Sequence, residues 1–182
     1  MIRRAQQLGF SLPEIRELLV LQHEDGETCF HVRDLLRAKV ATVRGKIREL
    51  YPEHEPEFDL ALHTGMRRGE QYRLRWQDVD LKRGIITVTR SKHGEARRIQ
   101  INSTARAALL ALRDRADGVG YVCPGYDGPR TRDWRNWFEK AVQAAAIQNL
   151  RWHDLRHTFA SRLVIAGVPL RAIQVLMGYK RI

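Results

Sequence analysis

Two arginines, a lysine and a histidine have the types and contexts that could act on a phosphodiester. Arg67 lies in the stretch TGMRRGE, Lys92 lies in the loop SKHGEA, and His153 and Arg156 lie in HDLRHTFAS. Residues three apart on a helix face the same way, so His153 and Arg156 should point in one direction. Arginine presents a planar fork of donors that matches phosphate oxygens. If the four side chains converge, they form a cationic pocket for a phosphate group.

Neighbouring charged residues could support such a pocket. Glu70 follows Arg67 by three residues and could orient its guanidinium group. Four further arginines are candidates for DNA phosphate contacts, although each alone could equally be a solvated surface charge: Arg68, Arg97, Arg98 and Arg132.

The charge of the chain is unevenly placed. The net charge is +11 with a sequence pI near 10.3. Residues 1–50 hold 9 basic and 7 acidic residues, whereas 51–182 hold 23 and 14. A basic balance of this size favours an acidic polymer as partner.

The elements that must position these residues are mostly helices. Periodicity predicts helices at about 56–64, 69–77, 103–116, 131–146, 153–166 and 169–177, a hairpin of 84–90 with 97–101, and a short strand near 121–123. The expected fold class is therefore mainly α (α+β), with a small three-stranded antiparallel sheet. The four tryptophans are interpreted as core or groove-edge residues: Trp76, Trp134, Trp137 and Trp152.

The first fifty residues show a purely helical pattern. Ser11-Leu12-Pro13-Glu14 has the form of a capping box that opens a helix. Apolar residues at three- and four-residue steps over 28–50, among them Val43 and Ile47, predict a helix that packs along a partner helix. Prolines and acidic residues at 51–57 mark a junction. We expect two parts, a helical segment 1–50 and a domain 51–182.

Other classes of protein are disfavoured. Cys29 and Cys123 are far apart and outside any CxxC pattern, which predicts reduced thiols, no disulfide framework and no metal site. No apolar run could cross a bilayer, and the N-terminus does not read as a secretory signal, so we expect no membrane contact and a cytoplasmic protein.

From about residue 52 to the end, the motifs TGMRRGE, the hairpin lysine and HDLRHTFA resemble the tyrosine recombinase, or phage integrase, family. The resemblance implies an integrase-type catalytic domain in which Arg67 and Arg156 hold the non-bridging phosphate oxygens. It implies that Lys92 protonates the leaving 5′ oxygen and that His153 is the general acid/base. In that family a tyrosine attacks DNA and forms a 3′-phosphotyrosyl link, with no cofactor. The partner that the resemblance implies is double-stranded DNA.

Two positions depart from that pattern. Met177-Gly178 is followed by Tyr179, where the family places His or Trp; a tyrosine can still donate a hydrogen bond to phosphate. The family's nucleophilic tyrosine belongs on a later helix, and this sequence ends at Ile182. We therefore expect a DNA-binding protein of the recombination and integration type that does not cleave DNA alone, unless a partner subunit supplies a tyrosine in trans. Whether the chain is an enzyme stays open.

Residues 2–50 resemble the middle of MerR-family transcription regulators, where this stretch leads into a long dimerisation helix. The alternative function is thus a non-enzymatic, dimerising MerR-like regulator fragment, and a third reading is a fused fragment that folds only in part. Cys29 falls where metal-sensing members place one thiolate, but its companion cysteines are missing. Self-association is expected through helix 28–50 or through an apolar patch near Leu176 and Met177 at the C-terminal end.

Overall fold

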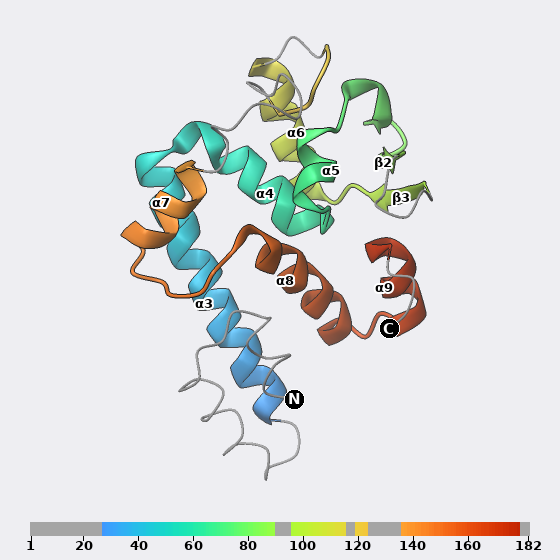
Figure 1. Cartoon of the computed structure of the whole chain (residues 1–182). Helices are drawn as coiled ribbons and strands as arrows, with labels where there is room; N and C mark the ends of the chain where they lie inside the picture. The colour runs from blue at the N-terminus through green and yellow to red at the C-terminus, as the bar shows by residue number, and fades with distance from the viewer. Residues whose placement is uncertain (1–26, 90–95, 116–118, 124–135, 179–182) are drawn as a thin grey trace.

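The computed structural model describes residues 27–89, 96–115, 119–123 and 136–178, with only the backbone of 27–36. In chain order the elements are α3 (Glu27–Leu50), the short 3₁₀ helix η2 (Pro52–His54), α4 (Glu55–Thr64), α5 (Arg68–Tyr72), η3 (Trp76–Asp78), β1 (Val79–Asp80), β2 (Ile85–Val88), β3 (Arg97–Gln100), α6 (Ser103–Arg115), α7 (Asn136–Ala144), α8 (Trp152–Ile165) and α9 (Leu170–Met177). The described part is mostly helical with one small antiparallel sheet, as predicted (Figure 1).

The sheet packs on α6 through one of its faces. Its strand order is β1-β2-β3, and Ile86 in the middle strand pairs with Val79 and with Ile99. Ile86, Ile99 and Val88 are buried together with Leu109 of α6. Because side chains alternate along a strand, every second residue of the hairpin faces this core.

The third strand is Val79–Asp80, so the prediction of a strand near 121–123 was wrong. In the described residues, Tyr121 makes an isolated bridge with Arg75. This pairing also explains why the helix predicted over 69–77 ends at Tyr72, since the backbones of 74–76 and 120–122 bond to each other. Val122 donates to the Leu74 carbonyl at 2.8 Å, and Trp76 donates to the Gly120 carbonyl at 3.1 Å.

A second core lies between α3, α4, α7 and α8 and is rich in aromatic rings. Trp152 contacts Trp137 edge-on at 5.5 Å between ring centroids and Phe138 at 5.2 Å. Trp137 also stacks on His54 at 4.6 Å. Trp137 and Trp152 are buried, as the sequence predicted, and Cys123 is a buried free thiol in the same core.

The helix predicted over 28–50 is present as α3, but its apolar stripe packs within this chain. Val40, Val43 and Ile47 are buried in the core shared with α7 and α8, and α3 runs beside α7 in Figure 1. These side chains are therefore not available to a partner helix. The second half of α3 packs on α4, α7 and α8, and a domain boundary near residue 50 stays a prediction.

The apolar patch expected near Leu176 and Met177 is present only in part. Met177 is buried, whereas Leu176 is partly exposed. Exposed apolar side chains near them are Leu170 (58%) and Val175 (61%) on α9, with Val164 and Ile165 at the end of α8.

In the part of the chain that the structure describes, no helix combines the length and the apolar character needed to cross a membrane.

Candidate functional site

The turn after α4 brings the two predicted motifs into direct contact. Gly65 caps α4 in a left-handed conformation with φ 61°. A Cβ atom there would lie 2.4 Å from a ring carbon of Phe159 on α8, so both the backbone angle and the space require glycine. Thr64 closes the last turn by donating its hydroxyl to the Leu60 carbonyl at 2.6 Å. Arg67 then starts α5 from an extended conformation.

Glu70 fixes Arg67 by two hydrogen bonds. The backbone N–H of Arg67 donates to Oε2 of Glu70 at 2.7 Å, and Nη1 of Arg67 donates to Oε1 at 3.0 Å. The first bond is the reciprocal half of a capping box at the start of α5. The contact expected from the three-residue spacing is therefore present.

The same carboxylate holds a second arginine. Arg97 on β3 donates from Nη1 to Oε1 of Glu70 at 2.8 Å and from Nη2 to Oε2 at 2.6 Å, a bidentate pair. Both side chains are almost fully buried, Arg97 at 6% and Glu70 at 5% exposure. Burial alone would raise the pKa of Glu70, but the bonds from Arg97 and from the Arg67 backbone outweigh it and lower that pKa.

This burial disagrees with the interpretation of Arg97 as a DNA phosphate contact. Its Nε donates to the Leu176 carbonyl at 3.0 Å, so all three guanidinium nitrogens are engaged inside the protein. Arg98, the next residue, is exposed on the other face of the strand. Strand alternation, which places Arg97 on the same face as Ile99, was the signal that could have separated the two.

Arg156 is the most enclosed cation of the site. It is 1% exposed and donates from Nη1 to the Gly65 carbonyl and from Nη2 to the Met177 carbonyl. Nη2 of Arg67 donates to the next carbonyl, that of Gly178, at 3.3 Å.

Three successive carbonyls at the end of α9 thus accept from three arginines: Leu176 from Arg97, Met177 from Arg156, and Gly178 from Arg67. The last carbonyls of a helix have no partner within the helix and carry its partial negative charge, which makes them good acceptors for cations. Nothing in the sequence pattern predicts these contacts, because they join segments far apart in the chain.

His153 lies beside these arginines with an exposed side chain. Partial burial lowers the pKa of His153 to about 4, and the nearby charges of His157, Arg156, Arg67 and Arg68 act in the same direction. Its ring also meets that of His157 edge-on, with centroids 4.8 Å apart. His153 is therefore neutral at pH 7 in the free protein.

The structure thus brings together Arg67, Glu70, Arg156 and His153. Arg68 is partly exposed at the start of α5. Three predicted site residues lie outside the described residues: Lys92, Arg132 and Tyr179.

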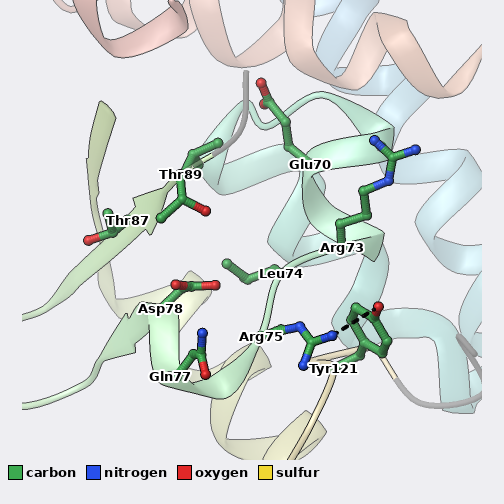
Figure 2. Close-up of a pocket in the computed structure, with 11 residues that line it drawn as sticks. Glu70, Arg73, Leu74, Arg75, Gln77, Asp78, Thr87, Thr89 and Tyr121 are labelled. Carbon is green, nitrogen blue, oxygen red and sulfur yellow. Dashed lines mark hydrogen bonds between the residues drawn. The ribbon is translucent and has the colours of Figure 1, made fainter. Parts of the chain in front are cut away.

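A hollow of about 730 Å³ extends from this cluster between α5 and β2. Figure 2 shows Glu70 and Thr89 at one end of it and the Arg75–Tyr121 pair at the other. Arg75 lies over the Tyr121 ring at 4.7 Å, and Nη2 donates to the tyrosine hydroxyl at 3.3 Å. Arg73 also lines this hollow and is exposed. Neither Arg73 nor Arg75 was among the site residues predicted from the sequence.

Comparison with protein-family models gives two matches. Residues 47–182 match the phage integrase family, and residues 1–51 match the model described as MerR, DNA binding.

Among curated proteins, the chain is similar to the integrase of Salmonella phage P22, with 32% identity over 137 residues that cover 68% of this chain and 35% of that protein. It is similar to the shufflon-specific DNA recombinase of Escherichia coli, with 33% identity over 126 residues, covering 68% and 31%. It is also similar to tyrosine recombinase XerC of Xanthomonas campestris pv. campestris (strain 8004), with 33% identity over 129 residues, covering 68% and 40%. The matched part spans about a third of the length of these relatives.

Three solved structures share the fold. XerA recombinase superposes with a TM-score of 0.68 at 24% identity, covering 79% of this chain and 55% of that one. The Tn1549 transposon integrase, solved with transposon right end DNA, gives 0.65 at 21%, covering 79% and 57%. The catalytic domain of bacteriophage HP1 integrase gives 0.63 at 22%, covering 79% of both chains. The integrase-type fold expected from the sequence is confirmed.

Proposed function

The chain belongs to the phage integrase family, and on that premise we propose that it binds double-stranded DNA and grips one backbone phosphodiester with Arg67, Arg156 and His153. The observation that carries this proposal is the convergence of Arg67 and Arg156 on the end of α9. Both guanidinium groups already donate to oxygen atoms there, those of Gly178 and Met177. A phosphodiester offers oxygens of the same kind with a full negative charge.

Binding requires an exchange of acceptors. Arg67 keeps 24% of its side chain exposed and His153 is exposed, so both can meet a phosphate directly. Arg156 is buried, and it reaches the phosphate only when the Met177 carbonyl gives way. Charge-assisted hydrogen bonds are roughly twice as strong as those to neutral acceptors, which favours the exchange.

The side chains of this cluster are suited to stabilise charge and to move a proton during phosphoryl transfer. Two guanidinium groups facing the non-bridging oxygens would stabilise the charge that builds on them in the transition state. Neutral His153 can accept or relay a proton in the same place. Lys92, as the acid for the leaving 5′ oxygen, stays a prediction from the family motif. The class of reaction supported is DNA strand transfer in recombination and integration.

The attacking group is the part of this chemistry that the described residues do not supply. The described tyrosines pack in or against the aromatic core, away from the arginine cluster: Tyr51, Tyr72 and Tyr121. The Tyr72 hydroxyl donates to Glu57 at 2.8 Å, and Tyr121 pairs with Arg75. Tyr126 and Tyr179 lie outside the described residues, so DNA binding without a covalent link stays a prediction from the family motif.

Binding to a generic duplex across a salt series tests the proposal. Wild-type binding should weaken steeply with salt, because cations that bind phosphate release counterions. Arg67→Gln should lower the salt slope by about one and weaken binding, whereas Arg113→Gln, an exposed arginine of α6, should leave both unchanged. Equal binding by the Arg67 variant and the wild type would overturn the proposal.

A nicked suicide duplex tests the expected absence of cleavage. The chain should leave no DNA-linked protein band on a denaturing gel. A covalent adduct that disappears in Tyr179→Phe would show that Tyr179 is the nucleophile and would contradict this part of the proposal.

The match of residues 1–51 to a MerR model favours the dimerising regulator as a second candidate. The burial of Val43 and Ile47 inside this chain argues against dimerisation through that stripe. Sedimentation at increasing concentration decides whether a dimer forms at all.

A further inference from the structure

A second basic hollow lies on the side of α8 away from His153 and Arg156. It encloses about 560 Å³ between α3, α4, α6 and α8. Its lining residues are Arg37, Arg44, His63, Thr104, Thr158, Ser161, Arg162, Ile165 and Ala166. At about 100° per residue, Thr158 and Arg162 point roughly opposite to the side of α8 that carries His153 and Arg156, so the two sites are separate.

The hollow carries more positive than negative charge. Three arginines line it, and one of them, Arg44, pairs with Asp59. Burial lowers the pKa of Arg162, and the charges of Arg44 and Arg37 lower it further, while Asp59 partly opposes them. Among the hydrogen bonds and ion pairs of the described residues, none is made by Arg162. The charge of Arg162 thus lies near two like charges, and Arg162 makes no direct ion pair with a described residue.

The polar groups around these cations suit an oxyanion. Guanidinium forks match phosphate oxygens bidentately, and the hydroxyls of Thr104 and Ser161 supply further donors. His63 adds a ring that is held neutral, because burial and the charge of Arg162 lower its pKa. Ile165 and Ala166 form an apolar wall. The volume falls within the range of about 300–1,000 Å³ typical of small-molecule sites, which favours a small anion over a duplex.

The hollow lies where a segment that matches the MerR model meets a segment that matches the phage integrase model. Arg37 and Arg44 lie on α3 before residue 47, where the phage integrase match begins, and within the MerR match of residues 1–51. Arg162, Ser161 and Thr104 lie within the integrase match. Neither match alone contains all three arginines.

We propose that this hollow is a binding site for a small phosphate-bearing anion, held by Arg37, Arg44 and Arg162 with the hydroxyls of Thr104 and Ser161. Bound there, the anion bridges α3 to α8. It therefore stabilises the folded chain in proportion to its occupancy.

Calorimetric titration of the full chain with sodium pyrophosphate, against sodium chloride at equal ionic strength, tests the site. Pyrophosphate should bind and raise the melting temperature beyond the chloride control. Arg162→Gln should weaken binding about tenfold, the loss expected for one charged hydrogen-bonding group, and Arg113→Gln should not change it. Without ligand, Arg162→Gln should melt no lower than the wild type, since the substitution relieves repulsion.

Arg67→Gln separates this site from the DNA phosphate cluster. Pyrophosphate binding that survives in Arg67→Gln and falls in Arg162→Gln supports the proposal. Binding that falls only in Arg67→Gln, or no binding by the wild type, overturns it. Amide chemical-shift changes in the wild type should centre on Ser161 and Thr104; changes centred on Gly65 to Glu70 would also overturn it. A duplex that binds less well to Arg162→Gln, with pyrophosphate inert, would reassign the hollow to nucleic acid.

Discussion

The guanidinium group of Arg156 donates to the carbonyl of Met177, 21 residues further along the chain, and both residues are fully buried. Arg67 and Arg97 contact the carbonyls on either side of it. The arginines of the site are thus held apart from one another by helix-end oxygens and by Glu70 rather than by solvent.

Glu70→Gln should lower the free energy of unfolding by about 3 kcal/mol, because it leaves buried Arg97 without its charged partner. Urea unfolding measures the change. Glu139→Gln, an exposed glutamate on α7, is the matched control and should change stability by less than about 0.5 kcal/mol. An unaltered midpoint for Glu70→Gln would mean that the shared carboxylate contributes nothing to the fold.

Arg97→Gln and Arg98→Gln should distinguish an arginine that stabilises the fold from one that contacts DNA. Arg97 is buried in the Glu70 pair, so its loss should destabilise the chain by about 3 kcal/mol. Arg98 is exposed on the neighbouring face, so its loss should leave stability unchanged and lower the salt slope of DNA binding by about one. If Arg97→Gln is as stable as the wild type and lowers the salt slope of DNA binding, Arg97 contacts a DNA phosphate after all.

Acid should destabilise the free protein as the pH falls from about 6.5 to about 4. The pKa of His153 is lowered to about 4 when folded, so in this interval the unfolded chain binds a proton that the folded chain does not. His63 and His157, whose pKa values are also lowered, act in the same direction. Glu70 extends the loss to lower pH, since the stability that its lowered pKa confers disappears as the pH falls through that pKa. His153→Gln should flatten part of this slope in urea unfolding at stepped pH; an unchanged slope would argue against the shift.

DNA should raise the pKa of His153, because a phosphate beside the ring favours its charged form. Imidazole proton shifts followed by NMR with and without duplex measure this. If the two titration curves coincide, the phosphate does not lie beside His153.

Val43→Asp and Ile47→Asp should unfold the chain rather than dissociate a dimer. Both side chains are fully buried in the aromatic core, and a charge there costs at least about 3 kcal/mol. Ala41→Asp, exposed on the same helix, is the control and should retain the wild-type melting curve. A folded monomeric Val43→Asp derived from a dimeric wild type would instead support a dimerisation helix.

Local spacing predicts part of this site. The three-residue step from Arg67 to Glu70 and the one from His153 to Arg156 are helix-surface relations, so they could be inferred before any fold was known. The helices that carry them follow from apolar periodicity, and α4, α6, α8 and α9 begin and end within about two residues of their predicted limits.

The rest depends on contacts between distant segments. Arg97 meets Glu70 across 27 residues, and Arg67 meets Gly178 across 111. The two-residue strand Val79–Asp80 is too short to show any alternation of its own. The apolar stripe of α3 was correctly recognised, but a stripe does not specify whether the surface that covers it belongs to the same chain or to another.

If DNA binds as proposed, its phosphate and the end of α9 compete for the hydrogen-bond donors of Arg67 and Arg156. The two equilibria are then coupled, so the factor by which docked α9 lowers DNA affinity equals the factor by which bound DNA weakens the docking of α9. A partner that binds the exposed Leu170 and Val175 and displaces α9 would then activate DNA binding without contacting the DNA.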